Sequence, residues 1–257
     1  MKPSARTWAG CQVVRLDSVD STNRIARQLA AQGAPHGTLV LARTQTAGRG
    51  RRGRSWISPD GDGIFMTLIL RPGEDFASAR NLSLQAALAV ARAISRTTGL
   101  DARIKWPNDV VCMGRKVCGM LLEMDADGGV LHDVVLGVGI NVHQQVFPEE
   151  IAHTASSLDL LTGARQDSEA VVSAFLDAME EVCALAQADE AAFMAAYAAQ
   201  SATLGQRVQV IAHAGSYTGL AQAVTPDGAL LVLRDEDGAL CEVLAADVSV
   251  RGIMGYV

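Results

Sequence analysis

The sequence predicts an α+β protein in two parts: a larger part in which strands and helices are interspersed, and a small all-β part at the C-terminal end. Strand-like and helix-like hydrophobic patterns alternate up to about residue 204, whereas short strands with Thr-Pro-Asp-Gly and Asp-Glu-Asp-Gly turns follow from Gly205. A hydrophobic content of 49% over 257 residues is enough for a packed core. We therefore expect domains at residues 1–204 and 205–257.

Each element can be placed by its pattern. Strand patterns lie at residues 11–16, 38–42, 64–70, about 101–106, 117–124 and 131–142, and four more lie at 206–212, 216–224, 229–234 and 239–244. A first helix contains Ile25 and Leu29 and ends at Gly33. Residues 78–98 are apolar nearly all round and stop at Gly99, which is typical of a buried helix with a glycine C-cap. Ser168 is expected to cap a third helix, and an Ala-rich helix follows at about 189–200.

Composition narrows the function classes. The longest apolar run, Val134 to Val142, is about half of the ~20 residues that a membrane helix needs, and the N-terminus lacks the apolar stretch of a signal peptide. We therefore expect a soluble protein that stays in the cytoplasm. Five cysteines without CxxC spacing argue against a disulfide framework or a zinc knuckle.

Positive charge is concentrated in one place. The net charge is −6, yet residues 43–54 hold five arginines and no acid, which leaves −11 for the rest of the chain. A general nucleic-acid binder spreads its basic charge over a face, so a local spot fits a small phosphorylated ligand better. Gly48-Arg-Gly-Arg-Arg-Gly53 matches GxGxxG, but a proline, two glycines and a strand follow instead of a helix, which excludes a Rossmann motif. The alternatives left open are a phosphate-binding loop and a solvated or RNA-binding basic loop.

Two further segments favour nucleotide chemistry. Lys105-Trp-Pro-Asn-Asp109 and Lys116 bring two cations near a carboxylate, which suits nucleotidyl transfer with Mg²⁺, although surface lysines on a turn would look the same. Gly137-Val-Gly-Ile-Asn141 interrupts an apolar strand with glycines, as expected for a close ligand or for a bend in a barrel.

Taken together and in order, four motifs resemble the catalytic module of biotin–protein ligases. They are Asp20-Ser-Thr-Asn23, Gln45 to Trp56, Lys105 to Asp109 with Lys116 to Glu123, and Gly137 to Asn141. The resemblance covers about residues 15–145, and the small β part is similar to the SH3-like C-terminal domain of that family. It implies a mixed sheet flanked by helices, formation of biotinyl-5′-AMP from biotin and ATP, and transfer of biotin to a lysine of a carboxyl-carrier protein.

The resemblance also implies site residues. Those expected to bind biotin are Ser21, Thr22, Asn23, Gln45, Gly48, Arg49, Gly50, Arg51, Lys116, Gly119, Gly137 and Gly139. Those expected to bind the nucleotide are Arg51, Arg54, Trp56, Lys105, Asn108, Lys116 and Asn141. The catalytic set is Lys116, Arg49, Arg51, Lys105 and Asp109, with Asp109 also a ligand for Mg²⁺. The arginine loop is expected to close as a lid over the intermediate.

Further expectations concern partners and rivals. Mg-ATP and biotin are expected as substrates, without a tightly bound cofactor, and a biotin carboxyl carrier protein as acceptor. Only about twenty residues precede the Ser-Thr-Asn motif, so we expect no DNA-binding domain, and a monomer or weak homodimer without membrane contact. The nearest rival is a lipoate or octanoate ligase of the same architecture, and a non-enzymatic RNA-binding module is a more distant one.

Overall fold

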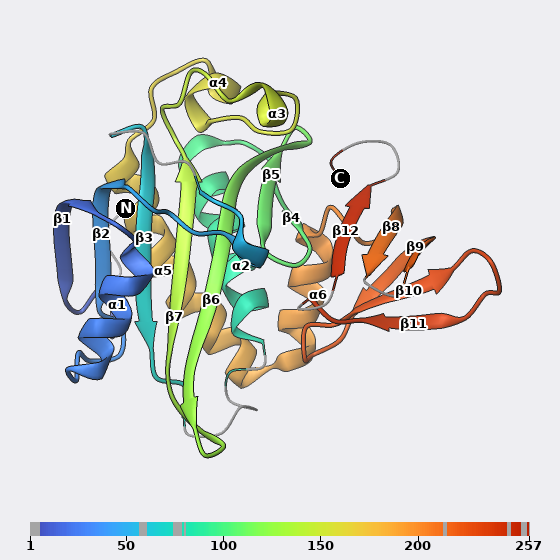
Figure 1. The fold of residues 1–257 in the computed structure, drawn as a ribbon, viewed down its shortest axis with the longest axis horizontal. Helices are drawn as coiled ribbons and strands as arrows, with labels where there is room; N and C mark the ends of the chain where they lie inside the picture. Colours follow the sequence, from blue (N-terminus) through green and yellow to red (C-terminus); the bar gives the residue numbers. More distant parts are fainter. Residues whose placement is uncertain are drawn as a thin grey trace.

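The computed structural model describes residues 6–56, 61–73, 79, 81–212, 215–245, 248–252 and 256, which form two sheets and their helices (Figure 1). The larger sheet has the strand order β1-β2-β3-β7-β6-β5-β4. Its strands are β1 (Val13–Val19), β2 (Leu39–Gln45), β3 (Gly63–Leu70), β4 (Ala102–Lys105), β5 (Asp109–Cys112), β6 (Arg115–Asp127) and β7 (Val130–Asn141). Only β1 and β2 pair in parallel, so the sheet is mixed, which confirms the expected architecture.

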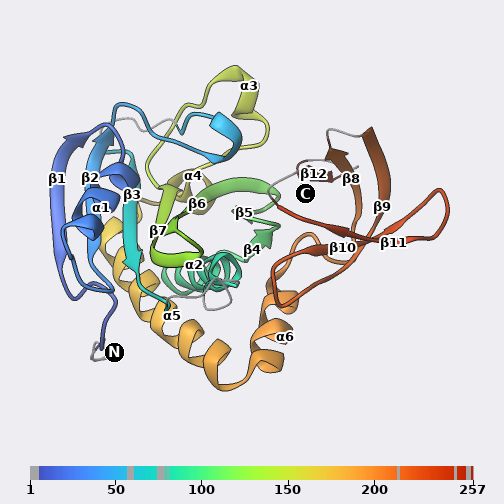
Figure 2. The same ribbon diagram turned by 60° about the horizontal axis from the view of Figure 1, so that its bottom comes forward.

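Helices cover both faces of this sheet (Figures 1 and 2). They are α1 (Thr22–Ala31), α2 (Leu82–Thr98), α3 (Glu149–Ala152), α4 (Leu158–Thr162), α5 (Ser168–Ala188) and α6 (Glu190–Gln200). The helices α2 and α5 share the main apolar core with alternate residues of β3, whereas α1 packs against a smaller cluster that includes Val40, Ile69 and Val135 on the opposite face. Among the described helices, none is both long and apolar enough to cross a membrane.

Of two predicted helix caps, one is confirmed and the other is wrong. Helix α2 ends at Gly99, whose φ of 74° is left-handed, as expected for a glycine C-cap. Its predicted start at residue 78 lies outside the described residues. Helix α5 is capped by Asp167 and not by Ser168: the Asp167 side chain accepts hydrogen bonds from the N–H groups of Glu169 and Ala170. Carboxylate and hydroxyl both favour an N-cap, so adjacent candidates could not be separated by type alone.

One short strand of the larger sheet was not predicted from the sequence. Strand β5 follows the Trp106-Pro107 turn, and a two-residue hairpin with positive φ at Met113 (50°) and Gly114 (72°) joins it to β6. As a result, Asp109 is the first residue of a strand instead of part of a loop. The missed strand also brings Asp109 directly opposite Gly119 of β6.

The C-terminal part is a five-stranded antiparallel sheet in the order β11-β10-β9-β8-β12. Its strands are β8 (Arg207–Ala212), β9 (Gly215–Val224), β10 (Leu230–Arg234), β11 (Leu240–Val243) and β12 (Val248–Gly252). Four of them match the expected strands, and β12 was missed. This sheet fits an SH3-like domain, although the strand pairing of the described residues leaves β11 and β12 at its two edges instead of closing a barrel.

The small sheet lies beside the β4–β5 and α6 end of the molecule (Figure 2). Trp106 joins the larger part to the small sheet through a hydrogen bond from its ring N–H to the carbonyl of Gly228 at 3.0 Å. Its main-chain N–H donates to the hydroxyl of Thr203 at 3.0 Å. Because Trp106 belongs to the turn before Asp109, this docking places β12 close to the same turn.

Candidate active site

A cavity of about 890 Å³ opens between four parts of the fold: the arginine loop (residues 48–54, called the Arg/Gly loop below), the middles of β6 and β7, the segment around α3, and β12. It is lined by every residue that the sequence analysis placed in the site except Gly48, which lies at the base of the loop. The residues brought together are Ser21, Thr22, Asn23, Gln45, Arg49, Gly50, Arg51, Arg54, Trp56, Lys105, Asn108, Asp109, Lys116, Gly119, Gly137, Gly139 and Asn141. Segments that are far apart in the chain therefore share one cavity, while the role of each residue stays a prediction.

One end of the cavity is a polar cluster at the start of α1. The Oε1 atom of Gln45 accepts hydrogen bonds from the main-chain N–H of Thr22 (2.9 Å) and from its hydroxyl (3.0 Å). Thr67, fully buried in β3, places its hydroxyl 2.8 Å from that of Thr22 and 2.7 Å from Oδ1 of Asn23. Asn23 in turn donates to Glu123 at 2.7 Å. These contacts fix both donors and acceptors at a buried position, as recognition of a polar ligand requires.

The glycines of β6 and β7 admit close neighbours. A Cβ on Gly139 would lie 2.5 Å from Cε2 of Trp56, and one on Gly119 would lie 2.7 Å from Cζ3 of the same ring. For the glycines of β7, a flat ligand, a close backbone contact or a bend in a barrel was expected from the sequence. Here the indole of Trp56 lies on Gly119 and Gly139, and the Asn23 side chain lies on Gly137, so the protein's own side chains make the close approach.

Charges gather round Asp109 in the middle of the cavity. Oδ1 of Asp109 forms an ion pair of 2.7 Å with Nζ of Lys116, although the angles are poor for a hydrogen bond. Oδ2 accepts a hydrogen bond of 2.6 Å from the hydroxyl of Tyr256, and Nζ of Lys105 lies 3.5 Å from the centre of the Tyr256 ring. Of the two expected lysines, Lys116 contacts the carboxylate directly, and Lys105 lies opposite Asp109 in the pairing of β4 with β5.

Burial changes the protonation of this cluster. The pKa of Lys105 falls to about 8, first because burial disfavours the charged ammonium and second because Lys116, Arg54 and Arg251 repel it, while Asp109 opposes the shift. Lys105 is thus still mainly protonated at neutral pH, but it loses its charge at a pH where an exposed lysine would keep it.

The Arg/Gly loop is folded back on itself next to the cavity. Gly50 donates to the carbonyl of Arg54 at 2.7 Å and Trp56 donates to that of Gly48 at 2.9 Å, which closes a compact turn. Within it, Arg52 has a left-handed φ of 57°. Arg51 reaches out of the turn, where it donates to Oδ1 of Asn108 at 2.9 Å and to the carbonyl of Ala245 in the small domain. Burial lowers the pKa of Arg51.

The far end of the cavity lies at the end of β7. Nδ2 of Asn141 donates to the carbonyl of Ser156 at 3.1 Å, and Gln144 is almost fully buried beside it. Phe147 and residues of α3 complete this end.

Comparisons with known proteins agree with this geometry. The sequence profile of the Biotin/lipoate A/B protein ligase family matches residues 16–141, and that of the Biotin protein ligase C terminal domain matches residues 203–251. The Biotin--[acetyl-CoA-carboxylase] ligase of Mycobacterium tuberculosis is 34% identical over 94% of this chain and 89% of its own length. The chain belongs to the biotin protein ligase family.

Solved structures of the biotin protein ligase family extend the likeness to the whole fold. The biotin protein ligase of Aquifex aeolicus in complex with biotin and ATP superposes with a TM-score of 0.80 at 30% identity, covering 94% of this chain and 99% of that one. The Bifunctional ligase/repressor BirA of Bacillus subtilis is 41% identical over 67% of this chain. The chain spans about half the length of such Bacillus relatives, since the match covers 54% of them.

The cavity is also lined by residues that were not expected from the sequence. They come from the segment after β7 (Gln144, Phe147) and from the C-terminal part (Gln209, Arg251, Tyr256). The C-terminal residues carry no local motif, and only the docking of the small sheet brings them to the cavity. For Gln144 a signal did exist: it lies three residues beyond the predicted site residue Asn141.

Proposed function

We propose that this chain is an ATP-dependent biotin protein ligase, which forms biotinyl-5′-AMP and transfers biotin to a lysine of a biotin carboxyl carrier protein. The observation that carries the proposal is the layout of one cavity along the face of β7. A polar cluster lies at Gly137, cations and a carboxylate lie beside Gly119, the residue of β6 that pairs with Gly139, and a polar end follows at Asn141. This order suits an acid with a polar head, then phosphates, then a nucleoside.

The polar cluster supports biotin as the acid. A ureido ring carries N–H donors and a carbonyl acceptor, and the buried Ser21 and Thr22 and the half-buried Gln45 supply partners of both kinds. Biotin can lie on Gly119 and Gly139 only when the indole of Trp56 moves off them, and Trp56 would then cover the apolar part of biotin or its chain. The biotin set in this proposal remains Ser21, Thr22, Asn23, Gln45, Gly48, Arg49, Gly50, Arg51, Lys116, Gly119, Gly137 and Gly139.

The charged middle supports nucleotidyl transfer. A carboxylate oxygen of biotin attacks the α-phosphorus of ATP, the bond from that phosphorus to the bridging oxygen breaks, and pyrophosphate leaves. Negative charge accumulates on the phosphate oxygens, and Lys116 is positioned to neutralise it, with Lys105 on the other side of Asp109. The nucleotide set remains Arg51, Arg54, Trp56, Lys105, Asn108, Lys116 and Asn141.

Asp109 fits a magnesium ion that is bound mainly by the nucleotide. Mg²⁺ takes oxygen ligands and commonly uses one or two carboxylates together with phosphates and water. Within the described residues there is no group of three or more His, Cys, Asp or Glu side chains that could hold a metal by itself. Asp109 would therefore hold the ion jointly with the phosphates, and the ion would offset their charge when bound.

The second step needs protection from water. Biotinyl-5′-AMP is a mixed anhydride, and its carbonyl must meet the neutral amine of the acceptor lysine before water does, with AMP as the leaving group. Arg51 links the loop to Asn108 and to the small domain, so it can keep the loop closed over the intermediate. We accordingly propose residues 1–204 as the catalytic domain and 205–257 as an SH3-like domain that closes one side of the site.

A lipoate or octanoate ligase is the rival on the same architecture. An octanoyl chain has no polar head, so it would place apolar surface against the polar groups of Thr22, Gln45 and Asn23. The match to the biotin protein ligase C-terminal domain also favours biotin.

A transfer assay tests the proposal. The protein is incubated with biotin, Mg-ATP and a biotin carboxyl carrier domain, and the carrier is weighed by mass spectrometry. We expect the mass of one biotinyl group on the acceptor lysine, and none on a carrier whose lysine is replaced by arginine. An unmodified carrier in the presence of folded protein would contradict the proposal. A parallel incubation with lipoate in place of biotin that alone modifies the carrier would establish the rival.

A further inference from the structure

The cavity presents many cations to an acceptor that is itself a cation. Five arginines and two lysines line it, whereas the described carboxylates of its lining are Asp109 and Glu150. Both oxygens of Asp109 are already engaged, by Lys116 and by Tyr256. A lysine side chain arrives as an ammonium ion, because its ordinary pKa is about 10.4, and it must lose a proton before its nitrogen can attack. The transfer step therefore needs a group in the cavity that can take a proton.

One residue of the lining is suited to that task. His153 is the single histidine among the described residues that line the cavity. It directly follows α3 and is exposed, so a ligand can reach it. Its ring forms no hydrogen bond or ion pair with any other residue that the structure describes. A neutral imidazole accepts a proton readily, which the charged arginines and lysines around it cannot do.

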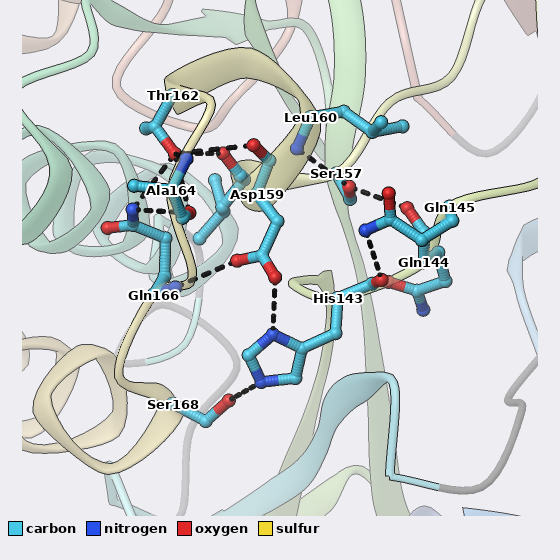
Figure 3. A network of polar contacts seen from close by, with 11 residues as sticks. His143, Gln144, Gln145, Ser157, Asp159, Leu160, Thr162, Ala164, Gln166 and Ser168 are labelled. Carbon is cyan, nitrogen blue, oxygen red and sulfur yellow. Dashed lines mark hydrogen bonds and ion pairs between the residues drawn. The ribbon is translucent and has the colours of Figure 1, made fainter.

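The neighbouring histidine of this segment is occupied elsewhere, as Figure 3 shows. The ring of His143 contacts Asp159 through Nδ1 at 2.9 Å and Ser168 through Nε2 at 3.2 Å. His143 is also not one of the described residues that line the cavity. It fixes the start of the segment, which leaves His153 as the imidazole that faces a ligand.

The main chain next to His153 is tied to β6 at Lys116. The N–H of Lys116 donates to the carbonyl of Thr154 at 2.7 Å, and the N–H of Ser156 donates to the carbonyl of Lys116 at 3.0 Å. Lys116 and Ala155 thereby form a parallel bridge. Since Lys116 is the cation that we assign to the phosphate, His153 belongs to the segment that borders the phosphate position.

We propose that His153 is the base that takes a proton from the acceptor lysine in the transfer step. This inference rests on the proposed function. The ammonium gives one proton to the imidazole, and the amine nitrogen attacks the carbonyl carbon of biotinyl-5′-AMP. The bond from that carbon to the phosphate oxygen breaks, the electron pair leaves with AMP, and one further proton of the nitrogen passes to the departing phosphate.

Glu150 gives the same entrance a negative charge. It precedes His153 by three residues, lines the cavity and is exposed. Within the described part of the chain it forms no ion pair. The ammonium is therefore attracted to the α3 side of the cavity and repelled from the Arg/Gly loop, which brings it to the imidazole.

The transfer step can be measured apart from adenylate formation. The protein is loaded with synthetic biotinyl-5′-AMP and mixed with a biotin carboxyl carrier domain. We expect His153→Ala to transfer biotin about one hundredfold more slowly, while biotin-dependent exchange of pyrophosphate into ATP is unchanged. Added imidazole should restore the transfer rate by about tenfold or more, because the exposed site is open to a small base.

His132→Ala is the matched control. His132 is exposed on β7 and is not part of the described lining of the cavity, so its variant should transfer biotin at the normal rate with or without imidazole. Normal transfer by His153→Ala overturns the inference and leaves the ligase function standing. Slow transfer that imidazole does not restore also overturns it, because His153 would then act without accepting a proton. If the unmodified protein transfers no biotin, the proposed function is wrong and this inference is wrong with it.

Discussion

The hydroxyl of Tyr256 donates a hydrogen bond of 2.6 Å to Oδ2 of Asp109, whose other oxygen pairs with Lys116 at 2.7 Å. Both oxygens of the carboxylate that we assign to Mg²⁺ are therefore engaged by the protein itself. Burial and the negative charge of Asp109 raise the pKa of Tyr256, so the phenol stays protonated and remains a donor. A magnesium–nucleotide complex must compete with this contact.

Replacement of Tyr256 by phenylalanine tests that competition. Tyr256→Phe removes the donor and keeps the ring next to Lys105, so we expect the Mg²⁺ concentration for half-maximal activity to fall severalfold, up to about tenfold. The measurement is a MgCl₂ titration of adenylate formation. Tyr217→Phe, on β9 and outside the lining of the cavity, should leave the titration unchanged. A higher Mg²⁺ requirement in Tyr256→Phe would show that the tyrosine assists the site instead.

Lys116→Ala should slow adenylate formation by a factor of about one hundred or more, because the cation beside Asp109 would no longer offset charge in the transition state. Biotin should bind more weakly by the loss of the Lys116 contact but should still bind, since the polar cluster at Thr22 and Gln45 is untouched. Single-turnover kinetics measure the effect. The neighbouring exposed Arg115→Ala is the control, and equal rates for the two variants would remove the role of Lys116.

Arg51→Ala should release or hydrolyse biotinyl-5′-AMP about tenfold faster, because it loses the bonds to Asn108 and Ala245 that join the loop to the small domain. The half-life of adenylate on the protein, followed with labelled biotin, reports this loss. Circular dichroism should show a normal fold. An unchanged half-life in the folded variant would contradict the function of the loop as a lid.

The buried Lys105 predicts a pH dependence. Its pKa of about 8 means that the ammonium is charged at neutral pH and is lost as the pH rises through 8, so the attraction for phosphate weakens in that direction. We expect kcat/KM for ATP, measured with saturating biotin, to decline above pH 8. A profile that stays flat well beyond pH 8 would show that Lys105 does not contact the nucleotide in its charged form.

The core makes a separate prediction about stability. Phe175 of α5 is fully buried in the core that α5 shares with α2, so Phe175→Ala should lower the free energy of unfolding by about 3–5 kcal/mol. Denaturant unfolding monitored by circular dichroism measures it. Leu160→Ala, at a half-exposed position on α4, should cost no more than about 0.5 kcal/mol. Equal losses would contradict this account of the core.

The sequence contained enough information for the parts of the site that lie in continuous motifs. Lys105, Asp109 and Lys116 are close in the chain, and antiparallel pairing of β5 with β6 keeps them close in space. The C-terminal end of the buried helix before Gly99 could also be predicted, because the apolar pattern ends where a glycine C-cap follows.

The missing parts depend on tertiary structure. Strands β5 and β12 have four and five residues, too few to show a clear alternation. Pairing stabilises them, between β4 and β6 for β5 and with β8 for β12. Tyr256 meets Asp109 across 147 residues of chain, and only docking of the small sheet through Trp106 brings them together. The local sequence also does not reveal why residue 139 must be glycine, because its close neighbour is Trp56, which is distant in the chain.

The most direct test of the proposed function is biotin-dependent exchange of labelled pyrophosphate into ATP, with Mg²⁺ and with biotin, lipoate, octanoate or no acid. Exchange with biotin alone is the predicted result, since the hydrogen-bonding partners at Thr22 and Gln45 suit a ureido ring. Exchange that requires lipoate or octanoate, or no exchange with any acid by the folded protein, would contradict the proposal that this cavity activates biotin.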